Sequence, residues 1–388
     1  MSRILLLDGQ QRNVLSCVRS MGKNGHEVTV GSHKKDALCF GSRFVKKRFL
    51  YTDPEIKPDM FIEELVDHIK KNSYDLVLPF IDATTKPMVE KQDSIKKIIP
   101  LLLPPENAFE LAFDKAKTFR LAKKLNIPMP ATWFPESIQE AAEIAESLKY
   151  PLIIKPRISS GSRGLKIVKN FEEFKKKYAK TENEYHNPII QEFIPLKEAV
   201  GFVCLYGKDK KLKAYCQHRR LHEYPLTGGP STLRETILDN RLTVSGTRLL
   251  DELSWQGPAM VEFRVDARDN IPKLMEINPR LWGSIALHIS AGVNFPELIL
   301  REMQGKSYNS LLPYKTGQRA KWLLPGEILY FLANLRHGKI KLDALKWWGE
   351  NQTLDILSLD DPMPALIMVK NLFKSVFNLK TLRHSVFR

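Results

Sequence analysis

The stretch Ala259-Met-Val-Glu262-Phe-Arg264-Val-Asp266, followed after a short polar segment by Lys273-Leu-Met-Glu276-Ile-Asn278-Pro-Arg280, decides the fold class of this chain. Both runs alternate apolar and polar residues, which predicts a β-hairpin with one apolar and one polar face. The expected apolar face carries Val261, Phe263, Val265, Met275 and Ile277. The expected polar face carries Met260, Glu262, Arg264, Leu274, Glu276 and Asn278. A turn over 267–271 sets Glu262 directly opposite Glu276.

Two carboxylates that face each other across a hairpin destabilise the strand pair unless a cation lies between them. A hard divalent ion such as Mg²⁺ prefers oxygen ligands, and Glu262, Glu276 and the amide of Asn278 supply them on one face. Arg280 adds a positive charge where phosphate oxygens would complete the metal's shell. The alternative is a solvated hairpin face whose charges Arg264 balances. We favour the metal site, because the Glu-x-Asn-x-Arg order supplies ligands and a phosphate-binding cation together.

A second hairpin is predicted around the loop Ile158-Ser-Ser-Gly-Ser-Arg-Gly164, between a strand that ends at Lys155 and a strand that begins at Gly164. The loop glycines can adopt positive φ, so that successive backbone N–H groups converge on a phosphate, and Ser162 adds a hydroxyl donor. Lys155 would point a positive charge at the same place. Without that lysine, a plain flexible hairpin tip is an equal interpretation. A Walker A loop would open a helix instead.

Lys115 lies in a helical stretch expected from Glu106 to Leu125. It follows Asp114, a residue type that favours the N-cap of a helix. From that position the Lys115 ammonium would reach a bound phosphate from a second side. Taken alone, Lys115 is more readily interpreted as a surface lysine.

The segment Ile189-Ile-Gln191-Glu192-Phe193-Ile194-Pro195 is a predicted strand that runs into irregular chain. Exposed backbone groups at such a point can pair with the edge of an adenine, and Glu198 could accept from ribose hydroxyls. By composition alone the segment is more readily interpreted as a buried strand end.

A basic segment, Gln217-His-Arg-Arg220-Leu-His-Glu223, precedes Thr227-Gly-Gly-Pro-Ser231. Adjacent arginines beside a Gly-Gly hinge indicate an anion clamp next to a movable loop. A basic strand with a turn is the alternative.

The first hundred residues alternate short apolar runs with helical patterns and predict βαβ units around a small parallel sheet. Expected strands are Ile4 to Leu7, His26 to Val30 and Leu76 to Phe80, and expected helices are Arg12 to Lys23 and Asp59 to Lys71. The turn from Asp8 to Arg12 lacks the glycines of a dinucleotide fingerprint, which argues against NAD chemistry. Pro104-Pro105 marks an expected domain boundary.

The chain has 388 residues and a formal net charge of +16, which indicates several lobes and anionic partners. Its four cysteines form no zinc or disulfide pattern, and no apolar run is long enough for a signal peptide or membrane span, so we expect a cytoplasmic protein. No helix-turn-helix, RNP or zinc-finger pattern supports nucleic-acid binding.

Four motifs in this order resemble the ATP-grasp superfamily: Asp114-Lys115, Ile153-Ile-Lys155-Pro with its Ser/Gly loop, Gln191 to Ile194, and the hairpin from Val261 to Arg280. The segment from His218 to Ser231 is similar to carbamoyl-phosphate-synthase-like or carboxylate-amine ligase proteins. The resemblance implies an α/β pre-ATP-grasp domain over 1–105, an α+β ATP-grasp module of two subdomains over 106–305, and a helical basic extension over 306–388.

The resemblance also implies roles for single residues. Lys115 and Lys155 would hold phosphates, and the loop would cover them with Ser159, Ser160, Gly161, Ser162 and Gly164. Adenine would meet Gln191, Glu192, Phe193 and Ile194, and the ribose would meet Glu198, although this chain lacks the usual Gly before that acid. Glu262, Glu276 and Asn278 would hold one or two Mg²⁺ ions, with Mn²⁺ as an alternative. Arg220 and Arg280 would stabilise the transferred phosphoryl group.

The implied activity is that of an ADP-forming ligase, in which a small-molecule carboxylate attacks ATP to give an acyl phosphate and an amine displaces phosphate. We place the acceptor substrate against Asp82, Thr84 and Thr85, which follow a strand of the N-terminal sheet. The alternative function is a protein that binds ATP, or a membrane surface, without turnover. The oligomeric state stays open.

Residues 362–388 contain five Lys or Arg residues and no Asp or Glu. Apolar residues recur in this segment at helical spacing from Leu366 to Phe377. This pattern predicts an amphipathic helix. We favour packing of its apolar side on its own chain over peripheral contact with an anionic membrane.

Overall fold

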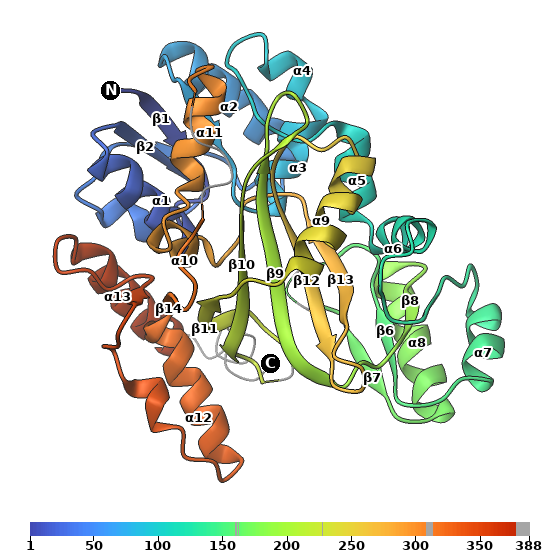
Figure 1. The fold of residues 1–388 in the computed structure, drawn as a ribbon. Coiled ribbons are helices and arrows are strands. Elements are labelled where there is room, and N and C mark those ends of the chain that lie inside the picture. The colour runs from blue at the N-terminus through green and yellow to red at the C-terminus, as the bar shows by residue number, and fades with distance from the viewer. Residues whose placement is uncertain (160, 162, 227, 308–312, 378–388) are drawn as a thin grey trace.

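The computed structural model describes residues 1–388 except 160, 162, 227, 308–312 and 378–388. Within that part of the chain the strands form three sheets (Figure 1). The N-terminal sheet is parallel, with the order β3-β2-β1-β4. Its strands are β1 (Arg3–Leu6), β2 (Glu27–Ser32), β3 (Val45–Leu50) and β4 (Leu76–Leu78).

Helices cover both faces of the N-terminal sheet because successive strand residues point to opposite sides. Ile4 and Leu6 pack with α1, whereas Leu5 and Leu7 pack with α2 and α3. The elements are α1 (Arg12–Lys23), the 3₁₀ helix η1 (Leu38–Gly41), α2 (Pro58–Lys71), α3 (Asp82–Glu90) and α4 (Gln92–Ile95).

The second sheet, β5-β8-β6-β7, is antiparallel. It consists of β5 (Thr132–Trp133), β6 (Leu152–Lys155), β7 (Lys166–Val168) and β8 (Ile189–Glu192). Two helices share its core, α7 (Ile138–Glu146) and α8 (Phe171–Tyr185). The connection from the N-terminal sheet contains α5 (Glu106–Phe113) and α6 (Lys115–Lys124).

The large sheet has the order β13-β12-β9-β10-β11-β14-β15 and is antiparallel except for its last pair. Its strands are β9 (Leu196–Tyr206), β10 (Leu212–Glu223), β11 (Ser231–Thr236), β12 (Gly257–Asp266), β13 (Pro272–Asn278), β14 (Arg319–Lys321) and β15 (Gln352–Leu354). The helices between them are α9 (Asn240–Glu252), α10 (Ile285–Ser290) and α11 (Phe295–Met303).

The two faces of the large sheet belong to different cores. Val261 and Phe263 pack with α6 and α9, whereas Met260 and Val203 belong to the core that also contains β1 and α1. The N-terminal sheet and the large sheet therefore share one core, and this fixes the position of one relative to the other.

The C-terminal extension contains the π-helical turn η2 (Leu323–Glu327), α12 (Ile328–Arg336), the 3₁₀ helix η3 (Leu342–Leu345) and α13 (Met363–Phe377). Helix α13 lies against η1, with Asn371 donating to the carbonyl of Asp36 at 3.1 Å. The helix packs on its own chain, as predicted, but it does so through Ala365, Ile367 and Met368. Leu366 and Phe373 of the predicted apolar side are 59% and 62% exposed, so the predicted contact face is wrong. Residues 378–388 lie outside the described residues. No described helix is both long and apolar enough to cross a membrane.

The predicted α/β domain, α+β module and helical extension are confirmed as the fold class. The sequence missed β3 in the N-terminal sheet and the short strands β14 and β15 in the extension. The single helical stretch expected from Glu106 to Leu125 is two helices, because the chain leaves helical geometry at Asp114.

Candidate functional site

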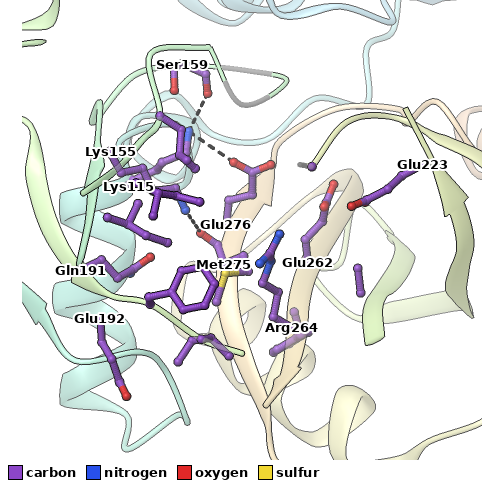
Figure 2. A pocket seen from close by; sticks show the side chains of 18 of the residues that line it. Lys115, Lys155, Ser159, Gln191, Glu192, Glu223, Glu262, Arg264, Met275 and Glu276 are labelled. Atoms are coloured by element: carbon purple, nitrogen blue, oxygen red, sulfur yellow. Dashed lines mark hydrogen bonds and ion pairs between the residues drawn. The ribbon is translucent and has the colours of Figure 1, made fainter. Parts of the chain in front are cut away.

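A cleft lies between the second sheet and the large sheet (Figure 2). β6 and β8 provide one wall, and β12 and β13 provide the facing wall together with the end of β10. Both walls mix charged and apolar side chains. The lining includes Lys115, Ile153, Lys155, Ser159, Gln191, Glu192, Phe193, Ile194, Arg220, Glu223, Glu262, Phe263, Arg264, Met275 and Glu276.

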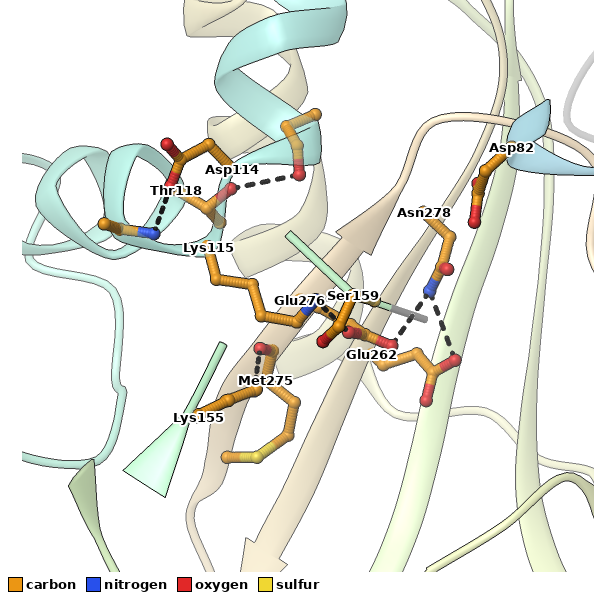
Figure 3. Close-up of polar contacts among 12 residues, drawn as sticks. Asp82, Asp114, Lys115, Thr118, Lys155, Ser159, Glu262, Met275, Glu276 and Asn278 are labelled. Atoms are coloured by element: carbon orange, nitrogen blue, oxygen red, sulfur yellow. Dashed lines mark hydrogen bonds and ion pairs between the residues drawn. The ribbon is translucent and has the colours of Figure 1, made fainter. Parts of the chain in front are cut away.

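The predicted pairing of Glu262 with Glu276 is confirmed, since the two residues are directly opposite in the register of β12 and β13. Asn278 lies beside both carboxylates (Figure 3). Its Nδ2 donates to Oε1 of Glu262 at 3.3 Å and to Oε1 of Glu276 at 3.4 Å. One strand pair thus gathers two carboxylates and an amide at the cleft.

The predicted alternation along β13 is wrong at one step. A bulge after the Glu262–Glu276 pair shifts the register, so that Phe263 faces Leu274. Leu274 is therefore buried in the core, whereas Met275 lines the cleft. A bulge adds one residue to one strand and is not visible in a pattern of period two.

Lys115 is buried, so its interpretation as a surface lysine is wrong. Its ammonium forms an ion pair with Glu276 at 3.3 Å and donates to the carbonyl of Ser159. The predicted N-cap is confirmed, because Oδ1 of Asp114 accepts from the N–H of Ala116 at 2.8 Å. Arg157 also binds the Asp114 carboxylate at 2.5 Å. These contacts tie the start of α6 to the loop after β6 and direct Lys115 into the cleft.

The two facing carboxyls have different environments. Burial raises the pKa of Glu276, but Lys115 and Lys155 outweigh burial and bring that pKa to about 2. Burial also raises the pKa of Glu262, and there the opposing effect of Arg220, its ion-pair partner, does not prevail. Arg220 and Lys115 therefore balance the charges that the alternative interpretation had assigned to Arg264.

Lys155 ends β6 and is buried beneath the cleft. Its ammonium donates to the carbonyl of Met275 at 2.9 Å and lies 5.4 Å from the centre of the Phe119 ring. Burial lowers the Lys155 pKa to about 8, although Glu276 opposes this shift. Within the described part of the Ser/Gly loop, Lys115 contacts the carbonyl of Ser159.

Two glycines of the loop after β6 have the positive φ values that the sequence predicts. Gly161 and Gly164 have φ values of 61° and 75°, where residues with a Cβ are strained. At Gly164 an added Cβ would also lie 2.6 Å from the Pro156 ring. Ser159 lines the cleft, whereas Ser160 and Ser162 lie outside the described residues.

The end of β8 forms the side of the cleft predicted for adenine. Among the described residues, the backbone of Ile194 has no hydrogen-bond partner, so its N–H and C=O are available to a ligand. The Glu192 carboxylate is engaged by Arg268 at 2.6 Å, and Gln191 donates to Thr132 at 3.0 Å. Glu198 lies within β9, pairs with Arg219 at 3.5 Å and does not line the cleft, so its ribose role stays a prediction.

Two arginines lie near the acidic pair on different elements, and Arg220 contacts a carboxylate of the pair whereas Arg280 contacts Asn278. Arg220, on β10, binds Glu262 and donates to the carbonyl of Gly229 at 3.1 Å, which joins the predicted clamp to its Gly-Gly turn. Arg280 binds Asp82 of α3 at 2.6 Å and donates to Oδ1 of Asn278 at 3.4 Å. Thr84 and Thr85, which we grouped with Asp82, are buried.

The sequence assigned no function to Glu223, although it lines the cleft 3.8 Å from Arg220. Strict alternation places Glu223 and Arg220 on opposite faces of β10. Register shifts between Arg220 and Glu223 bring the two side chains together. Arg264 also lines the cleft, and among the described residues it has no ion pair within 4.0 Å.

Glu262, Glu276 and Asn278 fit a magnesium site whose remaining ligands would come from a bound phosphate and water. The described residues contain no group of three His, Cys, Asp or Glu side chains that could hold a metal alone. The cleft instead offers two carboxylates, which are hard ligands. Asn278 turns its Nδ2 toward them and its Oδ1 toward Arg280, so its amide would have to rotate to present the oxygen as a third hard ligand. Mg²⁺ commonly uses one or two carboxylates and takes its other ligands from water and substrate phosphates.

Two family models match the chain on opposite walls of the cleft. The ATP-binding domain of the carbamoyl-phosphate synthase L chain matches residues 114–195. The model described as ATP-grasp in the biosynthetic pathway with Ter operon matches residues 213–324. The predicted resemblance to the ATP-grasp superfamily is therefore confirmed.

The carbamoyl phosphate synthase large chain of Pyrococcus furiosus is 30% identical over 52% of this chain and 19% of that protein. This chain spans from 16% to 63% of the length of curated relatives that it matches. The biotin carboxylase-β,γ-ATP complex of Campylobacter jejuni has a TM-score of 0.69 and 16% identity, over 82% of this chain and 74% of that chain. An L-amino acid ligase of Bacillus licheniformis has a TM-score of 0.61 and 15% identity, over 81% and 78%. These structures show that the chain has the ATP-grasp fold.

Proposed function

We propose that this chain is an Mg-ATP-dependent ligase that activates a carboxylate as an acyl phosphate, which an amine or similar nucleophile then attacks. The observation that carries the proposal is the convergence of Glu262, Glu276 and Asn278 with Lys115 and Arg220 in one cleft. Relatives and structures with this fold are named as ligases and carboxylases, which supports an enzyme. The proposal includes a division of the chain into an N-terminal domain over 1–105, an ATP-grasp module over 106–305 and a C-terminal extension over 306–388.

In this proposal ATP lies along the cleft between the two sheets. The unpaired backbone of Ile194 meets the adenine edge, beside the apolar side chains of Ile153 and Met275. The phosphates extend toward Lys115, Lys155 and the glycine loop, because these groups provide the cations and N–H donors of that region.

Glu262, Glu276 and Asn278 would hold one or two Mg²⁺ ions, or Mn²⁺, which supply Lewis-acid polarisation of phosphate oxygens when bound. The same carboxylates now accept Arg220 and Lys115. With their carboxylate partners holding a metal, Arg220 and Lys115 would be free to bind phosphate. The site would thus exchange internal ion pairs for contacts with the nucleotide.

The protein's own contribution is positioning and charge stabilisation. A substrate carboxylate oxygen bonds to the γ-phosphorus while the bond to ADP breaks, and Arg220 and Arg280 stabilise the negative charge on the transferred group. The amine then forms an amide bond as phosphate leaves. No side-chain nucleophile is needed, and burial raises the pKa of all four cysteine thiols, which keeps them protonated.

The substrate carboxylate is placed at the junction of Arg280 and Asp82. This pair joins the end of β13 to the start of α3, at the carboxyl edge of the parallel sheet where ligands of α/β domains bind. A carboxylate would compete with Asp82 for the guanidinium. Unchanged substrate dependence after Asp82→Ala would contradict this placement.

The experiment is release of ADP and phosphate from Mg-ATP with amino acids, small carboxylates and bicarbonate, each alone and in pairs with amines. We expect turnover that depends on one acceptor and is lost in Glu276→Gln. The control is Glu172→Gln, a change of the same kind at a side chain that is 80% exposed on α8. ATP binding with no turnover under any acceptor would support the alternative, a nucleotide-binding protein without catalysis. Equal activity of Glu276→Gln and wild type would contradict the metal site.

A further inference from the structure

The C-terminal extension carries an arm, residues 322–348, whose helix α12 projects away from the three sheets (Figure 1). From 335 to 348 every residue except Ala344 is exposed. Trp347 and Trp348 are 60% and 65% exposed. The exposed large apolar side chains of the arm are Ile328, Leu332, Leu335, Ile340, Leu342, Leu345, Trp347 and Trp348. Such a concentration on one projecting element marks an interaction surface.

The base of the arm is held by buried polar contacts. Lys321 is buried, and its ammonium donates to the carbonyls of Asp343 at 2.9 Å and Lys346 at 2.8 Å. His222 binds the buried Glu327 at 2.9 Å and stacks on Tyr330. These contacts fix the chain that leads to Trp347. The arm therefore presents its apolar side chains on a defined support, and η3 packs beside α12.

The arm also carries a positive charge. Lys339, Lys341 and Lys346 are exposed among the apolar side chains, and the single acid of residues 328–348, Asp343, lies 3.4 Å from His222. Segments that lie at the boundary between lipid headgroups and acyl chains combine tryptophan and leucine with lysine, as this arm does.

We propose that the arm binds an anionic lipid surface. A second copy of this chain is a poorer partner, because a contact between two arms would bring two positively charged surfaces into one interface. Anionic headgroups neutralise those lysines while the tryptophans enter the apolar boundary. This surface is distinct from α13, which packs against the N-terminal domain through Ala365, Ile367 and Met368 while its Leu366 and Phe373 are exposed.

The test is flotation of the full chain with vesicles of phosphatidylcholine and phosphatidylserine, and with vesicles of phosphatidylcholine alone. We expect binding to the mixed vesicles and little to the neutral ones. One lysine near an anionic surface strengthens binding about fivefold, so Lys339→Glu/Lys341→Glu should weaken it by at least about 25-fold. Trp347→Ala/Trp348→Ala should weaken it by about tenfold or more.

Matched controls separate the effect of the arm from the effect of net charge and from that of other exposed apolar side chains. Lys46→Glu/Lys47→Glu changes the net charge equally on the exposed part of β3, and Ile56→Ala removes another exposed apolar side chain. Both should bind like wild type, and thermal melts confirm that each variant folds. Absence of binding to mixed vesicles, or equal binding by arm and control variants, would overturn the proposal. So would a dimer in light scattering that becomes a monomer in Trp347→Ala/Trp348→Ala.

Discussion

Replacing Glu276 by Gln should destabilise the protein by about 3 kcal/mol at pH 7. The Glu276 carboxyl has a pKa of about 2 instead of its ordinary 4.5, because Lys115 and Lys155 outweigh the effect of burial. At about 1.4 kcal/mol for each tenfold change in proton affinity, that difference corresponds to about 3 kcal/mol of stabilisation by the ionised form. Glutamine keeps the shape of the side chain and removes the charge.

The sign of the pH dependence follows from the direction of this shift. A carboxyl whose pKa is lower in the folded state contributes stability above its ordinary pKa of 4.5, and the contribution disappears as the pH falls toward about 2. The variant should therefore show a smaller loss of stability than wild type across that interval. Urea unfolding followed by circular dichroism at a series of pH values measures the free energy of unfolding of both proteins.

Glu262→Gln is the matched comparison on the facing strand. Burial raises the pKa of Glu262, so a neutral side chain there relieves a desolvation cost, and Arg220 keeps its bond to the Gly229 carbonyl. We expect about 1 kcal/mol of destabilisation or less. Both variants should lose the rise in stability that Mg-ADP gives wild type, which is about 2.7 kcal/mol at 100 times the dissociation constant.

A decrease in the free energy of unfolding below about 1 kcal/mol for Glu276→Gln, or equal decreases for the two variants, would show that Lys115 and Lys155 do not stabilise the ionised Glu276 carboxylate. Retained Mg-ADP stabilisation in both would refute the metal assignment alone. The two readouts are independent, since unfolding is measured without nucleotide and the second uses it.

Three further changes test other parts of the structure. Asp355→Asn should cost about 3–5 kcal/mol in urea unfolding, because it leaves the fully buried Arg234 without its carboxylate at 2.5 Å, whereas the exposed Asp360→Asn should change little. Asp114→Ala should lower stability by about 1–2 kcal/mol through loss of the α6 cap and raise the KM for ATP by displacing Lys115, whereas an unchanged KM would show that the cap does not position that lysine. The affinity for ATP, measured by calorimetry, should fall as the pH rises through about 8, because burial lowers the Lys155 pKa to that value and the ammonium loses its charge. The variant Lys155→Met should bind ATP weakly at every pH and show little pH dependence.

The sequence by itself determined the local pieces and their order. Alternation with a period of two identified β12 and β13 and placed Glu262 opposite Glu276, because the two strands and the turn between them are contiguous in the chain. The sequence also predicted the N-cap at Asp114 and the positive φ of Gly161 and Gly164, because each of these features depends on a few neighbouring residues.

Only the tertiary structure decided which charges meet. Lys115 and Glu276 are far apart in the chain, and their ion pair depends on how α6 packs beneath the large sheet. The bulge that buries Leu274 and the register shifts that bring Glu223 beside Arg220 depend on pairing with other strands. Residue types fix the period of an element, whereas its register and partners follow from burial across the whole chain, and for that reason the carboxylate pair was predictable and its cationic partners were not.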